Sequence, residues 1–285
     1  MACAKKESSN NELNSGLTDE TGAHFVAGQI FSDRITKGLY GPELIVIAGK
    51  SFTQGAIKKD KQAQDNEKPA HQVEFNKLFS ISRSEITVAQ FREFVEITDY
   101  NTQADKNNSS NIFDLRSGKL VIKEGINWRH NHIGELATDI FPVVHVSFDD
   151  AMAYVQWLSK STNKTYRLPS ESEWEFALRA NSKTIYPWGK KLQDVRQGNL
   201  SGTVDKMPNN RKWGNALPNY ADGFWGLAPV RQYAAEGFGT FDMQGNVSEW
   251  VEDCWHDNYR RAPANGDAWV NPGCVQRVVR GSSWL

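Results

Sequence analysis

The sequence predicts a loop-rich fold that combines three helices with short β-strands. The 285 residues include 10 tryptophans and 22 glycines, and 39% of the residues are hydrophobic. This content of aromatic residues and glycine is typical of an irregular backbone that large rings anchor. From Tyr186 to Phe241 the chain has no regular hydrophobic period. Loops of that length inside a compact domain commonly carry function.

Three segments carry the sequence pattern of a helix start. Each opens with Ser or Thr, followed three residues later by Gln, Asp or Glu, which is the capping-box pattern. Apolar residues then recur at helical spacing, so each helix is expected to bury one face. The predicted helices begin after Thr87, Ser147 and Ser170. Strand-forming runs bounded by turn residues predict short strands at 44–47, 73–75, 78–82 and 277–280.

Charge and hydropathy exclude several classes of partner. The net charge of -1 gives no electrostatic reason to expect binding to nucleic acid. No apolar run approaches the roughly 20 residues of a membrane span. Residues 1–40 are expected to form a flexible polar leader, and residues 41–285 the folded domain. Cys3 with the polar spacer after it resembles the start of a mature bacterial lipoprotein, which predicts a lipid anchor there; a plain chain terminus is the alternative.

The run from Gly239 to Cys254 suits no ordinary amphipathic element. Asp242 and Glu249 supply carboxylate oxygens, and Gly239 and Gly245 permit turns with positive φ. Calcium takes six to eight oxygen ligands, so a loop that folds carboxylates and carbonyls together predicts a calcium site. A turn-rich surface loop is the alternative, because the spacing does not match an EF-hand.

Eight sequence blocks occur in order along the chain. They are LIVIAGKSFTQG at Leu44, FSISRSEITVAQFREFV at Phe79, PVVHVSFDDAMAYVQWL at Pro142, YRLPSESEWEFALRA at Tyr166, YPWG at Tyr186, DGFWGLAPV at Asp222, GTFDMQGNVSEWV at Gly239 and RVVRGSSW at Arg277. In this order they resemble the formylglycine-generating enzyme family, also called sulfatase-modifying factors. The resemblance extends from about Glu43 to the last residue.

This resemblance implies an α+β, C-type-lectin-like fold with little regular secondary structure. It also implies two structural calcium sites. The first set of matching positions is Asn199, Leu200, Asp222 and Phe224. The second set is Asp242, Gly245, Val247 and Glu249. Asp242 stands where the family's catalytic member has Asn, and the added charge is expected to strengthen cation binding.

The family's active enzymes oxidise a cysteine in a Cys-x-Pro-x-Arg segment to formylglycine, with copper(I) held by two cysteines. Thiolates suit copper(I) because both are soft. Those cysteines follow the motif that here ends at Ser283 and Trp284, so they are expected beyond Leu285, in a domain that is C-terminally incomplete. Ser283 matches a serine of the family's active site. Ser248 stands where active members carry tryptophan.

The three cysteines of this chain do not match that pair. Cys3 lies in the polar leader, and Cys254 and Cys274 flank a polar segment. A disulfide between Cys254 and Cys274 is one expectation, stabilising by about 3 kcal/mol on the chain-entropy model; two free buried thiols are the other. The disulfide and the lipoprotein-like leader both favour a periplasmic or envelope-associated location, with the cytoplasm as the alternative.

Two functions follow from the resemblance, and both expect a protein or peptide as substrate or partner. In the first, the domain oxidises a protein cysteine to formylglycine, with Ser283 at the edge of a groove that admits an extended substrate. In the second, it is a non-catalytic, calcium-stabilised binding or structural module. His130 and His132 have no nearby cysteine or paired acid that would complete a metal site.

Overall fold

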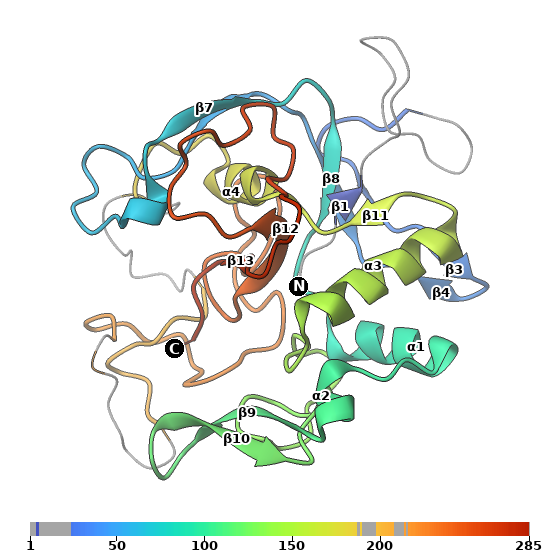
Figure 1. Ribbon diagram of the computed structural model, residues 1–285. Helices are drawn as coiled ribbons and strands as arrows, with labels where there is room; N and C mark the ends of the chain where they lie inside the picture. The colour runs from blue at the N-terminus through green and yellow to red at the C-terminus, as the bar shows by residue number, and fades with distance from the viewer. Residues whose placement is uncertain are drawn as a thin grey trace.

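An antiparallel sheet lies at the centre of the computed structural model (Figure 1). The structure describes residues 24–186, 189, 198–207, 214 and 216–284, together with the backbone of residues 4–5. Five strands form the sheet in the order β11-β1-β8-β5-β2. Their bounds are β1 Ala4–Lys5, β2 Ile30–Phe31, β5 Leu44–Ile47, β8 Phe79–Ser82 and β11 Tyr166–Arg167.

Four further antiparallel strand pairs are present in the described residues. They are β3 Arg34–Thr36 with β4 Leu39–Tyr40, β6 Ser51–Gln54 with β7 His71–Glu74, β9 Ser109–Asp114 with β10 Lys119–Glu124, and β12 Glu249–Cys254 with β13 Arg277–Arg280. The predicted strands at 44–47 and 277–280 are confirmed with the same bounds. Those at 73–75 and 78–82 are confirmed with shifted ends.

All three predicted helices are present. They are α1 Val88–Thr98, α3 Phe148–Thr162 and α4 Glu171–Arg179, and each begins with a complete capping box in which two orphan N–H groups find side-chain acceptors. The sequence analysis missed a short helix, α2 Gln103–Asn107, and a 3₁₀ turn at Asp65–Glu67. Each of these two elements is also opened by a capping box.

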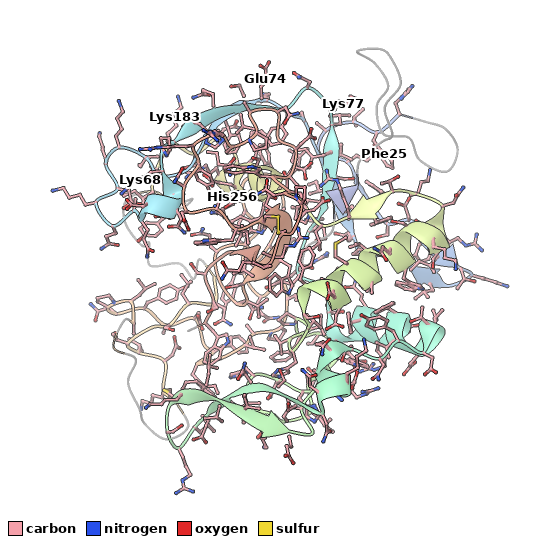
Figure 2. All side chains as sticks on the ribbon, viewed as in Figure 1. Phe25, Lys68, Glu74, Lys77, Lys183 and His256 are labelled. Carbon is pink, nitrogen blue, oxygen red and sulfur yellow. A yellow bond between two sulfur atoms is a disulfide. The ribbon has the colours of Figure 1, made fainter. Side chains whose placement is uncertain are left out.

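Strand β5 lies between two hydrophobic clusters because its alternate residues face opposite ways. Leu44 packs with Phe91 of α1 and Tyr154 of α3, whereas Ile45 packs with Trp174 and Phe176 of α4. Charged side chains such as Lys68, Glu74 and Lys77 lie at the periphery (Figure 2). The two layers of helices therefore fix the sheet from both faces.

The segment expected to be a leader contributes strands to this fold. Of residues 1–40, the structure describes 4–5 and 24–40. Strand β2 pairs with β5, β1 lies between β8 and β11, and Phe25 is buried. Cys3, the expected lipid anchor, lies outside the described residues.

The region from Tyr186 to Phe241 is irregular, as predicted. Its described residues form isolated bridges, such as Gly202 with Leu217, and no helix or strand. The α+β, loop-rich fold class is thus confirmed. Among the described residues, no helix has both the length and the apolarity that crossing a membrane requires.

Candidate functional site

The run from Gly239 to Cys254 consists of a loop followed by β12, and it buries both Asp242 and Glu249. Asp242 has a φ of 62°, and its carbonyl accepts the N–H of Gly245 at 3.2 Å. The Oδ2 atom of Asp242 accepts the N–H of Arg231 at 2.6 Å, whereas Oδ1 has no partner. Glu249 accepts the Nε1–H of Trp174 at 2.8 Å. Each carboxylate can therefore still accept further hydrogen bonds or bind a cation.

Glu85, which the sequence analysis missed, adds a third carboxyl group here. It is 1% exposed, and neither oxygen accepts a hydrogen bond from another described residue's N–H. The negative charge of Asp242 is one cause of the raised pKa of Glu85, so the two carboxyl groups are electrostatic neighbours. Glu85 comes just before α1, more than 150 positions from Asp242, and its sequence context gave no indication of the pairing.

Burial dominates the electrostatics of these acids. It raises the pKa of Asp242 to about 6 and the pKa of Glu249 above its ordinary range. Burial, followed by the charges of Asp242 and Glu249, raises the pKa of Glu85 well above its usual range. The ionised forms are costly in this environment unless positive charge compensates them.

The other predicted calcium set has Asp222 at its centre. Asp222 is fully buried; its Oδ1 accepts the N–H of Phe224 and its Oδ2 the N–H of Leu200, both at 2.7 Å. Asn199 donates its Nδ2–H to the carbonyl of Gly226 at 2.7 Å, and its Oδ1 is buried without a partner. The structure thus brings Asn199, Leu200, Asp222 and Phe224 together.

The two predicted sets are neighbours. Asn199 donates to Oδ1 of Asn246 at 2.9 Å, and Asn246 donates its N–H to the carbonyl of Asn199, also at 2.9 Å. A Cβ at Gly245 would lie 2.3 Å from that carbonyl oxygen, so only glycine fits there. The described residues contain no group of three or more His, Cys, Asp or Glu placed to hold a metal. A cation here would therefore depend on amide and main-chain oxygens as well.

Ser283 lies just after β13 and beside a cavity of about 530 Å³. We call this the Trp284 cavity; α2, the β9–β10 hairpin, His132, residues 144–147 and Trp284 line it. Trp284 donates its N–H to the carbonyl of Asn246 at 3.1 Å, which ties the cavity wall to the predicted calcium loop. Ser248 donates to the carbonyl of Gly281 at 3.3 Å. Ser283 itself is half-buried and is not among the lining residues.

Two histidines of the cavity wall occupy different environments. His145 bonds to Oγ of Ser110 at 3.0 Å through Nδ1 and to the carbonyl of Asn131 at 2.9 Å through Nε2. His132 packs against the ring of Trp284 with centroids 4.3 Å apart, and neither of its nitrogens has a hydrogen-bond partner among the described residues. The sequence favoured a solvent-exposed or hydrogen-bonded role for His132 over metal ligation, whereas its ring nitrogens are buried and its ring packs against Trp284, which is distant in sequence.

A second cavity, of about 320 Å³, lies beside Arg280 and Ser282 at the end of β13. Arg280 contacts Oε2 of Glu175 at 2.8 Å and Oε1 of Glu171 at 3.3 Å, and Arg179 contacts Oε1 of Glu175 at 2.7 Å. Burial alone would raise the pKa of Glu175, but the two guanidinium groups outweigh it and the pKa is lowered. This wall is a buried ion-pair network that fixes α4 to β13.

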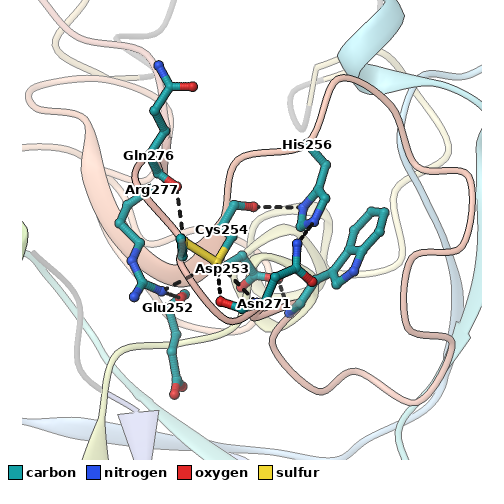
Figure 3. Close-up of a disulfide and its surroundings, with 9 residues drawn as sticks. Glu252, Asp253, Cys254, His256, Asn271, Gln276 and Arg277 are labelled. Carbon is teal, nitrogen blue, oxygen red and sulfur yellow. Dashed lines mark hydrogen bonds between the residues drawn. A yellow bond between two sulfur atoms is a disulfide. The ribbon is translucent and has the colours of Figure 1, made fainter.

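The disulfide between Cys254 and Cys274 is confirmed (Figure 3). The Cα atoms are 5.8 Å apart, and Cys254 is buried while Cys274 is half-buried. The Sγ of Cys254 accepts the N–H of Asn271 at 3.3 Å, and the guanidinium of Arg277 lies 3.8 Å away. Both thiols of the pair are consumed in this bond, so they do not fit a copper(I) dithiolate site.

Comparison with known proteins places these features in a family. The model of the sulfatase-modifying factor enzyme 1-like domain matches residues 33–285. The formylglycine-generating enzyme of Bos taurus is 30% identical over 268 residues, covering 85% of this chain and 66% of that protein. The inactive C-alpha-formylglycine-generating enzyme 2 of Mus musculus is 33% identical, covering 86% of this chain and 75% of that protein.

A solved structure agrees with these sequence matches. PvdO from Pseudomonas aeruginosa superimposes with a TM-score of 0.69 at 31% identity, covering 91% of this chain and 87% of that one. The chain spans 66% of the bovine and 58% of the mouse formylglycine-generating enzyme, which is less than two thirds of each. On the match of the family model and these relatives, this chain belongs to the sulfatase-modifying factor family.

Proposed function

We propose that this domain binds an extended polypeptide segment in the Trp284 cavity. The observation that carries the proposal is the cavity itself, which lies between the β9–β10 hairpin and Trp284. Leu120, Ile122 and Trp284 offer apolar surface for side chains, while Gln103 and Asn107 offer amide groups for a peptide backbone. Such a mixture of apolar walls with a few polar groups is typical of ligand sites.

Ile122 provides a direct test of this surface. It is 76% exposed, so replacing it with Ser removes contact area without opening the core. Burying an isoleucine contributes about 1.5–3 kcal/mol, so we expect Ile122→Ser to weaken peptide binding about tenfold. Tryptophan fluorescence titration with a Cys-x-Pro-containing peptide measures this. The control is Val275→Ser, since Val275 is 92% exposed and does not line the cavity; equal affinity in the two variants would contradict the proposal.

A second candidate is oxidation of the bound cysteine to formylglycine. The identity of 30–33% with proteins named formylglycine-generating enzymes favours it. The described cysteines do not supply a copper(I) pair, so this activity requires thiolates from other residues. The test incubates the protein with copper(I), oxygen and a cysteine peptide, and detects the aldehyde by mass spectrometry. An unmodified cysteine under conditions of saturating peptide would exclude this candidate and leave binding in place.

We further propose two structural calcium ions, one at Asn199, Leu200, Asp222 and Phe224 and one at Asp242, Gly245, Val247 and Glu249. The unpartnered Asn199 and Asp242 oxygens support this proposal, since a buried oxygen without a donor is costly. Glu85 supplies additional negative charge beside the second site. Calcium would neutralise these acids and hold the irregular loop whose Asn246 carbonyl accepts the N–H of Trp284.

The disulfide supports a location outside the cytoplasm, since such bonds persist in oxidising compartments. Lipid attachment at Cys3 is part of this proposal. Mass spectrometry of the native N-terminus tests the attachment: an added diacylglyceryl mass supports it, and an unmodified cysteine contradicts it.

A further inference from the structure

None of the described residues that line the Trp284 cavity is an Asp, Glu, Lys or Arg. Its polar groups are the amides of Gln103, Asn107 and Asn111 and the hydroxyls of three serines. Any charged side chain that entered would give up water without meeting an opposite charge.

The two histidines in the cavity wall, His132 and His145, add no positive charge to it. A carbonyl oxygen only accepts, so the Nε2 of His145 that contacts Asn131 carries the proton, and Nδ1 accepts from Ser110. Burial lowers the pKa of His145 below its ordinary value. Burial between aromatic rings lowers the pKa of His132 to about 4. Both rings are therefore neutral at neutral pH.

We propose that the Trp284 cavity selects polypeptide segments that carry no charged side chain, and that it discriminates against the Cys-x-Pro-x-Arg type of segment. This inference rests on the proposed peptide binding. A guanidinium that is moved out of water needs a carboxylate partner, and the described wall offers none. Apolar side chains of a peptide would instead gain stabilising contacts with Leu120, Ile122 and Trp284.

The test compares two short peptides that differ at one position, Cys-x-Pro-x-Leu and Cys-x-Pro-x-Arg, by isothermal titration calorimetry with the full chain. We expect the leucine peptide to bind about tenfold or more tightly than the arginine peptide, a ratio within the range that one pocket contact provides. Equal affinities, or tighter binding of the arginine peptide, would overturn the inference while peptide binding stands. If neither peptide binds, the proposed function fails, and the inference fails with it.

The two peptides also differ in their own hydration, which affects their measured affinities. A variant that adds a charge to the cavity wall tests the wall with the same two peptides. Asn111 lines the cavity opposite Ile122 in the β9–β10 register, so Asn111→Asp adds a carboxylate of the same shape to the wall. We expect it to reduce or reverse the preference for the leucine peptide. Gln62→Glu adds the same charge on an exposed loop outside the lining and serves as control. An unchanged preference in Asn111→Asp would contradict the inference, as would an equal change in the control.

Discussion

Removal of calcium is expected to lower the melting temperature of this domain substantially. An ion that binds only the native state adds about 4 kcal/mol per site when its concentration is 1,000 times its dissociation constant. For a domain of this size, each kcal/mol shifts the melting temperature by roughly 2–4 °C. Two occupied sites would therefore account for a shift on the order of 10 °C or more. Calorimetry with and without a chelator measures it.

The controls separate calcium from general chelator effects. Restoring calcium should restore the melting temperature, and magnesium should not, because magnesium demands a tighter octahedral shell. Glu249→Gln removes a carboxylate of the second predicted site and should make the protein less sensitive to the chelator. A melting temperature that does not respond to the chelator would contradict occupied structural sites.

The acids also predict an unusual pH dependence of the calcium-free protein. Burial raises the pKa of Asp242 from 3.8 to about 6, and the pKa of Glu85 is raised well above its usual range. A carboxyl group with a raised folded-state pKa costs stability as the pH climbs past its unfolded pKa. From about pH 4 to pH 6, Asp242 should therefore destabilise the chelated protein progressively. Glu85→Gln should raise the melting temperature of the chelated protein at neutral pH; a fall would contradict this account.

Arg280→Met is expected to destabilise the domain by about 3–5 kcal/mol, because it leaves the largely buried Glu171 without its cation and Glu175 with Arg179 alone. Glu175 has a side chain only 2% exposed, and Glu171 lies beside it. Chemical denaturation measures the loss. Adding Glu171→Gln to Arg280→Met should recover part of it, since Glu171 has then lost its guanidinium partner whereas Glu175 keeps Arg179.

An exposed ion pair provides the matched control. Arg92 contacts Asp139 at 2.6 Å, but the side chains are 35% and 60% exposed. Such a pair contributes at most about 1 kcal/mol, so Arg92→Met should change the free energy of unfolding little. Equal losses in Arg280→Met and Arg92→Met would show that burial does not determine the strength of the Arg280 network.

Local sequence patterns predicted the helices and several strands because their determinants are local. The capping boxes at Thr87, Ser147 and Ser170 position donors and acceptors within three residues of each other. Strand β5 reads as a continuous apolar run because both of its faces are buried. Strands β1 and β2 were missed because two residues carry no period, and their pairing with distant strands creates them.

The candidate site was predictable where one loop carries it and not where the fold assembles it. The predicted calcium positions come together through contacts such as that between Asn199 and Asn246. Glu85 and Asp242 are more than 150 positions apart in the sequence and become electrostatic neighbours only in the fold. The Trp284 cavity likewise combines α2, a hairpin and the chain near residue 284. A local sequence pattern cannot predict a cavity whose lining residues come from segments far apart in the sequence.

Hydrogen exchange with mass spectrometry, with and without a saturating uncharged cysteine peptide, tests peptide binding in the Trp284 cavity most directly. The account predicts slower exchange in β9–β10, in residues 144–147 and in the segment that ends at Trp284, with no change around the Arg92–Asp139 pair. Unchanged exchange in those three segments, or protection confined to the cavity beside Arg280, would contradict it.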